Sequence, residues 1–141
     1  MRILLVEDEA PLRETLAARL KREGFAVDAA QDGEEGLYMG REVPFDVGII
    51  DLGQGSPDLP SPPNVVKALK ARGITLIYVS HRMEELFALC EHVTVLRDGR
   101  FVATEAIAAT NQARVVRQMT GRELLVQTPA HLTRALGDEF L

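Results

Sequence analysis

The sequence predicts an α/β fold: one domain in which a mostly parallel sheet is covered by helices on both faces. Short apolar runs recur along the chain, and most are followed by a segment with helical spacing of apolar residues. Such alternation is typical of parallel sheets. The length of 141 residues fits one domain, and 46% hydrophobic with 26% charged residues excludes a disordered chain.

The first predicted strand covers residues 3–6, a continuous apolar run typical of a strand buried on both faces. We expect the next helix to begin at Pro11, because a residue without an N–H is tolerated in the first turn. It should end near Gly24. Its inward-facing residues recur one turn apart: Leu12, Leu16, Ala17 and Leu20.

The second strand is predicted over residues 25–29. Asp32 and Glu35 then have the spacing of a capping box, which indicates the start of a short helix. A third buried strand over residues 47–50 ends at Asp51.

Residues 54–63 form a segment rich in proline and glycine, at which the charge of the chain changes. Residues 1–58 carry a net charge of −7 and residues 59–141 a net charge of +2. We interpret the segment as a junction inside a single domain, because neither side is comfortably long for an independent α/β domain. The expected divisions are 1–53, 54–63, 64–125 and a C-terminal tail helix over 126–141.

The second half begins with a helix over residues 64–72, a very apolar strand over 74–79 and a helix over 82–90. Asp98 and Gly99 then give the strongest signal for a tight hairpin, between strands over 93–97 and 100–103. Two further helices are expected, one capped by Thr110 or Asn111 and ending at Gly121, the other carrying Leu132, Leu136 and Phe140.

The acidic residues that follow the strands are candidates for a metal site. Glu7 and Asp8 follow the first strand and Asp51 follows the third, and ligands bind at the carboxyl ends of strands in open α/β sheets. Three converging carboxylates would suit Mg²⁺. The alternative is that Asp8 and Glu9 cap a helix and Asp51 only ends a strand.

Residues 1–10, 24–30 and 45–53 resemble the first half of a bacterial response-regulator receiver domain. This resemblance implies that Asp51 accepts a phosphoryl group, and that Glu7 and Asp8 help to hold Mg²⁺. It also implies a sensor histidine kinase or a small phosphodonor as partner. Ser80, after the fourth strand, fits the hydroxyl position of that family.

The second half departs from the receiver pattern. His81 stands where the family has a small residue, and the fifth strand ends in Arg97, Asp98 and Gly99 where the family has a lysine. The missing cation puts the stabilisation of a phosphorylated state in question.

Residues 69–86, 93–104 and 116–124 resemble the C-terminal part of a sugar-importer ABC transporter ATP-binding subunit. By this resemblance His81 would be the switch-loop histidine. The chain has no phosphate-binding Gly-rich loop with its lysine, and Leu52 stands where the catalytic glutamate is expected. We therefore expect no nucleotide hydrolysis and no tight ATP binding.

We expect a flavodoxin-like three-layer sandwich, with a doubly wound sheet in strand order 2-1-3-4-5 and strand six as an antiparallel edge, because both resemblances imply that strand three lies beside strand four. The ABC-type arrangement is the alternative, with strand one between strands four and five. Two half-matches to unrelated families, joined at a proline-rich segment, favour an engineered or recombined chimera over a diverged receiver.

The function expected is a receiver-type signalling module, not an enzyme, that binds Mg²⁺ and is phosphorylated on Asp51 with help from Ser80. The alternative is a structural chimeric domain without activity, and a remnant ATP-binding module is the weakest candidate. The lone Cys90 indicates a reducing cytoplasm. A net charge of −5 disfavours nucleic acid, no segment would span a membrane, and we expect a monomer or homodimer.

Overall fold

The computed structural model describes residues 1–53 and 59–121. The chain divides into two compact units, Met1–Leu89 and Cys90–Leu141. Each unit is described by itself below. The single domain expected from the sequence stays a prediction, and the helix expected over 126–141 lies outside the described residues.

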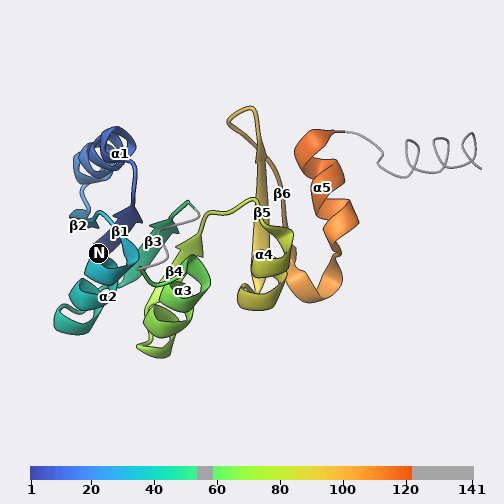
Figure 1. Ribbon diagram of the computed structural model, residues 1–141. Helices are drawn as coiled ribbons and strands as arrows, with labels where there is room; N and C mark the ends of the chain where they lie inside the picture. Colours follow the sequence, from blue (N-terminus) through green and yellow to red (C-terminus); the bar gives the residue numbers. More distant parts are fainter. Residues whose placement is uncertain (54–58, 122–141) are drawn as a thin grey trace, which may run out of the picture. The chain divides into compact units, whose positions relative to one another are not determined.

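The first unit contains a parallel sheet of four strands in the order β2-β1-β3-β4 (Figure 1). They are β1 (Arg2–Glu7), β2 (Ala26–Ala30), β3 (Val47–Asp51) and β4 (Thr75–Tyr78). β1 therefore lies between β2 and β3, which excludes the alternative in which it separates strands four and five.

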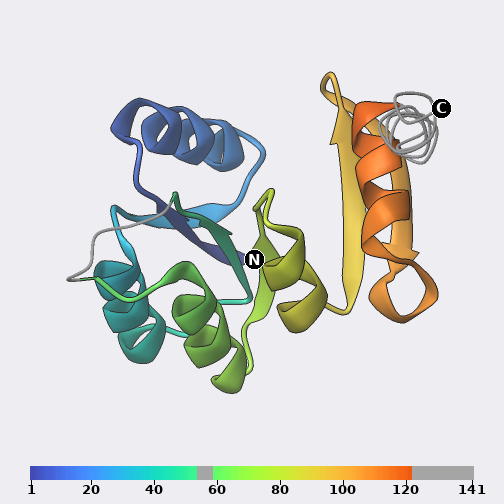
Figure 2. The ribbon, with the colours of Figure 1, turned by 45° about the vertical axis from the view of Figure 1, so that its right-hand side comes forward.

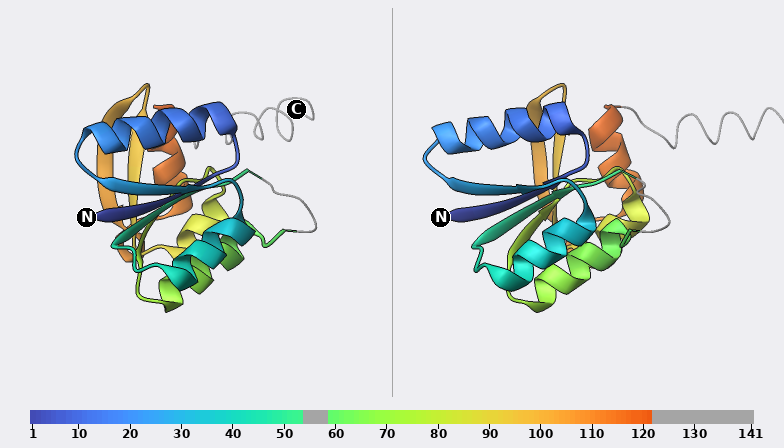
Figure 3. Two further views of the ribbon diagram at one scale, coloured as in Figure 1. Left: turned by 90° about the vertical axis from the view of Figure 1, so that its left-hand side faces the viewer. Right: turned by 60° about the vertical axis from the view of Figure 1, so that its left-hand side comes forward.

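Helices cover both faces of this sheet (Figure 3). Helix α1 (Ala10–Arg22) lies on one face, and α2 (Gly33–Glu42), α3 (Pro62–Ala71) and α4 (Met83–Leu89) lie on the other. The flavodoxin-like α/β fold is thus confirmed. The largest fully buried side chains of the core cluster come from the two central strands and α3: Leu4, Val6, Ile50, Val65 and Leu69.

Helix α2 packs through glycines, a feature that the sequence analysis did not use. Gly33, Gly36 and Gly40 are its buried residues. A Cβ atom on Gly36 would stand 2.8 Å from Cγ2 of Val6, and one on Gly40 would collide with the side chain of Leu69. These glycines let α2 approach β1 and α3 more closely than any larger residue would allow.

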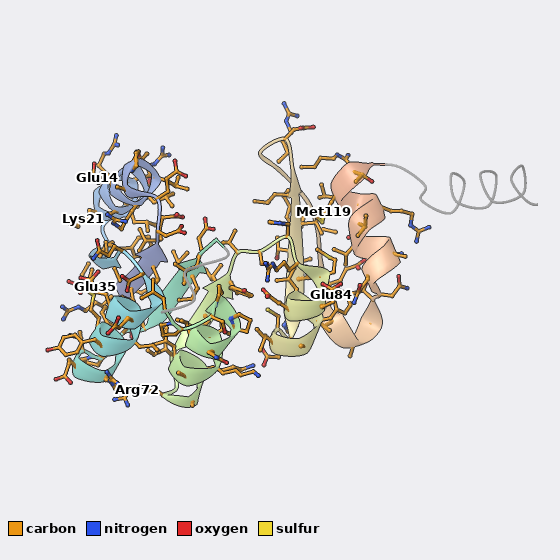
Figure 4. The ribbon with its side chains drawn as sticks, in the orientation of Figure 1. Glu14, Lys21, Glu35, Arg72, Glu84 and Met119 are labelled. Atoms are coloured by element: carbon orange, nitrogen blue, oxygen red, sulfur yellow. The ribbon has the colours of Figure 1, made fainter. Side chains whose placement is uncertain are left out.

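Both ends of α2 are capped by side chains. Asp32 Oδ1 accepts a hydrogen bond from the Glu35 N–H at 2.8 Å, as the capping box predicts. Glu35 Oε2 accepts from the N–H of Gln31 at 2.8 Å, one residue before the expected partner. At the other end, the Arg72 guanidinium donates to the carbonyls of Gly40 and Arg41, both at 3.1 Å. Figure 4 shows Arg72 beside this end of α2.

The junction segment ends in a helix sooner than the composition indicated. Ser61 caps α3, and its hydroxyl accepts from the Asn64 N–H at 3.4 Å. Pro62 then occupies the first turn, so α3 begins inside the segment read as a junction. Proline is compatible with this position because the first-turn N–H groups have no helical partner.

The second unit is an antiparallel hairpin with one helix along it (Figure 2). β5 (His92–Arg97) and β6 (Arg100–Ala106) are joined by Asp98 and Gly99, whose φ angles are 54° and 74°. Two consecutive positive φ angles fit the tight turn predicted for this pair. After a short 3₁₀ turn (Ile107–Ala109), α5 (Gln112–Thr120) packs on the hairpin.

Asn111, rather than Thr110, caps α5: its Oδ1 accepts from the Arg114 N–H at 2.9 Å. The buried residues of this unit are Val93 and Val95 on β5 and Val115 on α5.

The predicted strand order fails at strand five. Within the described ranges, β5 pairs with β6 alone, and β4 ends the four-stranded sheet. Val93 and Val95 on β5 are buried and α5 packs on that strand, so the hairpin and α5 form a small core of their own. The very apolar β4 consequently lies at a sheet edge, where Ile77 is 53% exposed.

Across residues 1–53 and 59–121, no helix combines the length and the apolar character that crossing a membrane requires.

Candidate functional site

Glu7 is the buried acid at the carboxyl end of the sheet. It is the last residue of β1 and lies directly opposite Asp51, the last residue of β3, in the parallel register. Only 2% of Glu7 is exposed. Its Oε1 accepts from the Glu9 N–H at 3.0 Å, whereas its Oε2 is buried without a hydrogen-bond partner. A buried carboxylate oxygen in this state requires a proton or a cation.

Burial raises the pKa of Glu7 to about 7. The hydrogen bond from the Glu9 N–H opposes the shift, while the neighbouring carboxyl groups of Asp51 and Asp8 add to it. Like charges in close proximity disfavour ionisation of at least one member. Glu7 therefore keeps its proton to an unusually high pH when no cation is present.

Asp8 is exposed and is tied to the loop that follows β3. Its Oδ2 accepts from the Gly53 N–H at 3.3 Å. The adjacent backbone is held by Arg13, whose Nη1 donates to the carbonyl oxygen of Glu7 at 2.9 Å. Asp8 thus connects the ends of β1 and β3 through a backbone contact.

The three predicted ligands fit Mg²⁺ in chemistry but do not form a ready-made cluster. The unpartnered Oε2 of Glu7 and the nearby carboxyl groups of Asp8 and Asp51 are oxygen donors of the kind that Mg²⁺ prefers. Among the described residues, however, no group of three or more His, Cys, Asp or Glu side chains could hold a metal ion as arranged. The carboxylates would have to turn towards a common point to hold one.

Asp51 lines a cavity of about 350 Å³ at the carboxyl ends of β3 and β4. Ser80, the predicted hydroxyl residue, lines the same cavity, and its Oγ accepts from the Arg82 N–H at 3.0 Å. Asp51 and Ser80, which the sequence analysis placed at the ends of two strands, thus line one cavity. Asp8 does not line this cavity but a separate one of about 580 Å³, which Arg13 and Asp32 also line.

Three further residues of the Asp51 cavity were missed from the sequence: Tyr78, Arg82 and Glu85. The Tyr78 hydroxyl donates to Glu85 Oε1 at 2.6 Å, and Arg82 Nη1 donates to Glu85 Oε2 at 3.1 Å. The signal available was the position of Tyr78 at the end of β4 and of Glu85 in the first turn of α4. Neither residue belongs to a recognised catalytic pattern, so composition alone could not single them out.

Arg97, at the position where a receiver has its lysine, serves another purpose. Its Nη1 donates to the carbonyl of Gln118 at 2.9 Å, in the last turn of α5. A cation at this end of a helix complements the unpaired carbonyls and the helix dipole. Gly121, with a φ of 72°, ends α5 beside the same guanidinium.

Comparison with solved structures finds receiver domains. A CheY-like receiver domain from Methylobacillus flagellatus is 26% identical with a TM-score of 0.53, covering 64% of this chain and 80% of that one. A response regulator, TrrA, solved in complex with the histidine kinase ThkA, gives 28% identity and a TM-score of 0.52, covering 62% and 78%. A Francisella receiver domain, at 18% identity and a TM-score of 0.51, supports the fold alone.

Comparison with curated proteins finds ribose import ATP-binding proteins. RbsA of Bacillus subtilis is 47% identical over 75 residues, which is 53% of this chain and 15% of that protein. RbsA 2 of Rhizobium meliloti is 57% identical over 60 residues, 43% of this chain and 12% of that protein. RbsA 2 of Burkholderia ambifaria is 31% identical over 144 aligned residues, 92% of this chain and 28% of that protein.

This chain therefore spans well under a third of the curated relatives that it matches. No family model matches it. The two likenesses agree with those read from the sequence: the chain combines a receiver-like α/β fold with a partial match to ribose-import ATP-binding proteins.

Proposed function

We propose that this protein is a receiver-type signalling module, not an enzyme, and that Asp51 accepts a phosphoryl group in the presence of Mg²⁺. The observation that carries the proposal is the register of β1 and β3, in which the buried acid Glu7 lies opposite Asp51. A receiver-like fold at 26–28% identity to solved receivers supports it.

Each site residue has a role that follows from its chemistry. Asp51 is the nucleophile, and the hydroxyl of Ser80, in the same cavity, donates to a phosphoryl oxygen. Glu7, Asp8 and Asp51 would hold Mg²⁺, and the ion would supply positive charge for the phosphoryl oxygens. The phosphodonor is a histidine kinase or a small acyl phosphate. The complex of TrrA with its kinase is a precedent among the structural neighbours.

Intact-mass measurement with acetyl phosphate and Mg²⁺ tests this proposal. We expect the parent protein to gain the mass of one phosphoryl group, and Asp51→Asn to gain none. Asp46→Asn is the matched control, because Asp46 is exposed and its carboxylate accepts a hydrogen bond from the backbone N–H of Arg2 at 2.7 Å. A parent protein that gains no mass, or an Asp51→Asn protein that gains the same mass, contradicts the proposal.

Thermal melts test the metal site independently of phosphorylation. Without metal, Asp51→Asn should raise the melting temperature, because it removes a negative charge beside Glu7. In the parent protein, Mg²⁺ should stabilise the fold by about 1–3 kcal/mol at tens to hundreds of times its dissociation constant, and less in Asp51→Asn. If NaCl of matched ionic strength shifts both proteins as much as MgCl₂ does, no metal site is formed.

A second candidate is a chimeric domain, engineered or recombined, that has no activity. It is favoured by the absence of an arranged metal cluster among the described residues and by the use of Arg97 as a helix cap. It predicts no phosphoryl uptake and no difference between MgCl₂ and NaCl. The two measurements above therefore separate the candidates.

A further inference from the structure

The cavity beside Asp51 contains an arginine whose charge is paired with a carboxylate. Arg82 Nη1 lies 3.1 Å from Glu85 Oε2, and both residues line the cavity with Asp51. The side chain of Arg82 is 42% exposed and that of Glu85 only 18%. Partly exposed ion pairs contribute little to stability, so Arg82 is free to exchange its partner at small cost.

Glu85 is held in place by a second contact that does not depend on Arg82. The Tyr78 hydroxyl donates to Glu85 Oε1 at 2.6 Å, so each carboxylate oxygen has its own donor. Burial and the adjacent Glu85 carboxylate raise the pKa of Tyr78 well above its ordinary value. Tyr78 therefore remains a donor at physiological pH, and it keeps Glu85 in position if Arg82 turns away.

A phosphoryl group on Asp51 would add negative charge to a cavity that already contains two acids. Of the described residues that line this cavity, Arg82 is the one lysine or arginine. The strand-five cation is engaged elsewhere, since Arg97 caps α5 in the other unit. The positive charge required next to the phosphoryl oxygens must then come from the loop after β4.

We propose that Arg82 binds the phosphoryl group on Asp51 by exchanging Glu85 for the phosphoryl oxygens, while Tyr78 retains Glu85. This inference rests on the proposed function. The guanidinium is suited to the role because its planar set of N–H donors matches the geometry of phosphoryl oxygens and its charge is permanent.

The covalent step itself belongs to Asp51. A carboxylate oxygen of Asp51 attacks the phosphorus of acetyl phosphate, and the bond between phosphorus and the acetate oxygen breaks. Acetate leaves with the bonding electron pair, and an acyl phosphate forms on Asp51. Arg82 forms no covalent bond and neutralises charge on the transferred oxygens.

Beryllofluoride with Mg²⁺ is the probe, because it mimics a phosphoryl group without covalent turnover. The 141-residue chain has two tyrosines and no tryptophan, so Tyr38→Phe leaves Tyr78 as its intrinsic fluorophore, at the cavity itself. Arg82→Gln should weaken the apparent affinity by about tenfold or more, since a hydrogen bond to a charged group is lost. Arg82→Lys should restore part of it.

Glu85→Gln distinguishes phosphoryl binding from a structural ion pair. This variant frees Arg82 yet leaves an amide oxygen to accept from Tyr78, so we expect beryllofluoride to bind more tightly than to the parent. A purely structural pair predicts weaker binding in both variants. Arg19→Gln and Glu23→Gln are matched controls, because this pair, 3.4 Å apart, lies at the end of α1 away from the carboxyl edge of the sheet.

Three outcomes overturn the inference. One is an Arg82→Gln protein that binds beryllofluoride as tightly as the parent does. Another is a Glu85→Gln protein whose affinity for beryllofluoride falls as far as that of Arg82→Gln. If the parent gains a phosphoryl group on Asp51 and either of these results is found, the inference alone fails. If the parent gains no phosphoryl group and binds no beryllofluoride, the proposed function fails and takes this inference with it.

Discussion

Glu7 couples the protonation of one carboxyl group to the stability of the first unit. Its pKa is about 7 in the folded protein, above the ordinary value of 4.5. Between these values the folded chain binds more protons than the unfolded chain, so the free energy of unfolding decreases as the pH rises through this window. The whole shift corresponds to a loss of at most about 3 kcal/mol by pH 8.

Glu7→Gln should remove this pH dependence, because a neutral amide has no charge to bury and its NH₂ group has carboxylates to donate to. Urea melts in EDTA at pH 5 and pH 8 measure the effect. Glu14→Gln, on the exposed side of α1 (Figure 4), is the control and should retain the parent's slope. A parent protein equally stable at both pH values would show that Glu7 ionises normally.

At the residue scale, the sequence predicted which residues lie at the ends of the strands, but not the hydrogen bonds that their side chains form there. Glu7, Asp51 and Ser80 could be assigned to one edge of the sheet because parallel strands end together. The hydrogen bond that ties Asp8 to the backbone of Gly53 depends on a loop conformation that has no sequence signature. The Tyr78–Glu85 contact likewise joins two elements and is invisible to periodicity.

The close approach of α2 to the sheet depends on glycines rather than on an apolar stripe. Gly36→Ala places a Cβ where Val6 Cγ2 is 2.8 Å away, so packing must shift. Alanine favours a helix over glycine by about 1 kcal/mol, but overpacking costs about 1–3 kcal/mol. We expect a net loss of about 1 kcal/mol in chemical denaturation, and Glu34→Ala on the exposed side of α2 should show none. A Gly36→Ala protein more stable than the parent would show that β1 and the Val6 side chain can shift to make room for the added methyl group.

Element types were predicted well, and the failures have identifiable causes. The helix that begins at Pro62 was expected two residues later, because a proline-rich run was interpreted as loop throughout. The strand over 74–79 was recognised from its apolar residues, yet apolarity does not report whether a neighbour strand is present. β4 lies at the edge of its sheet, and its composition resembles that of a central strand.

At the scale of the whole molecule, the two units have cores of unequal size. The hairpin unit buries Val93, Val95 and Val115, whereas the first unit buries a much larger set of aliphatic residues. Small cores open more readily, so the amides of β5, β6 and α5 should exchange hydrogen faster than those of β1 and β3.

Val95→Ala should lower hydrogen-exchange protection in the hairpin unit by about 2 kcal/mol and leave the first unit unchanged. Val65→Ala, in the core of the first unit, is the reciprocal control. If either substitution lowers protection equally in both units, the chain unfolds as one domain, as the sequence analysis predicted.

Strand order could not be extended to the fifth strand from the sequence, because the same residues satisfy two arrangements. A strand with alternate buried valines is compatible with a place beside β4 and with a separate hairpin. The Asp98-Gly99 turn pairs β5 with β6 in either arrangement, and the helix after the hairpin completes its small core.

The register of the strands also sets the order in which the chain acquires structure during synthesis. Residues paired across β5 and β6 lie at most 14 positions apart in the sequence, as in His92 and Ala106. Glu7 and Asp51, which are paired across β1 and β3, lie 44 positions apart. Local hairpins close in microseconds, while pairing of distant parallel strands is slower. A ribosome releasing this chain therefore presents β1 with its unpaired edge for a few seconds before β3 emerges. During that interval the unpaired edge of β1 is open to chaperones and to pairing with other chains.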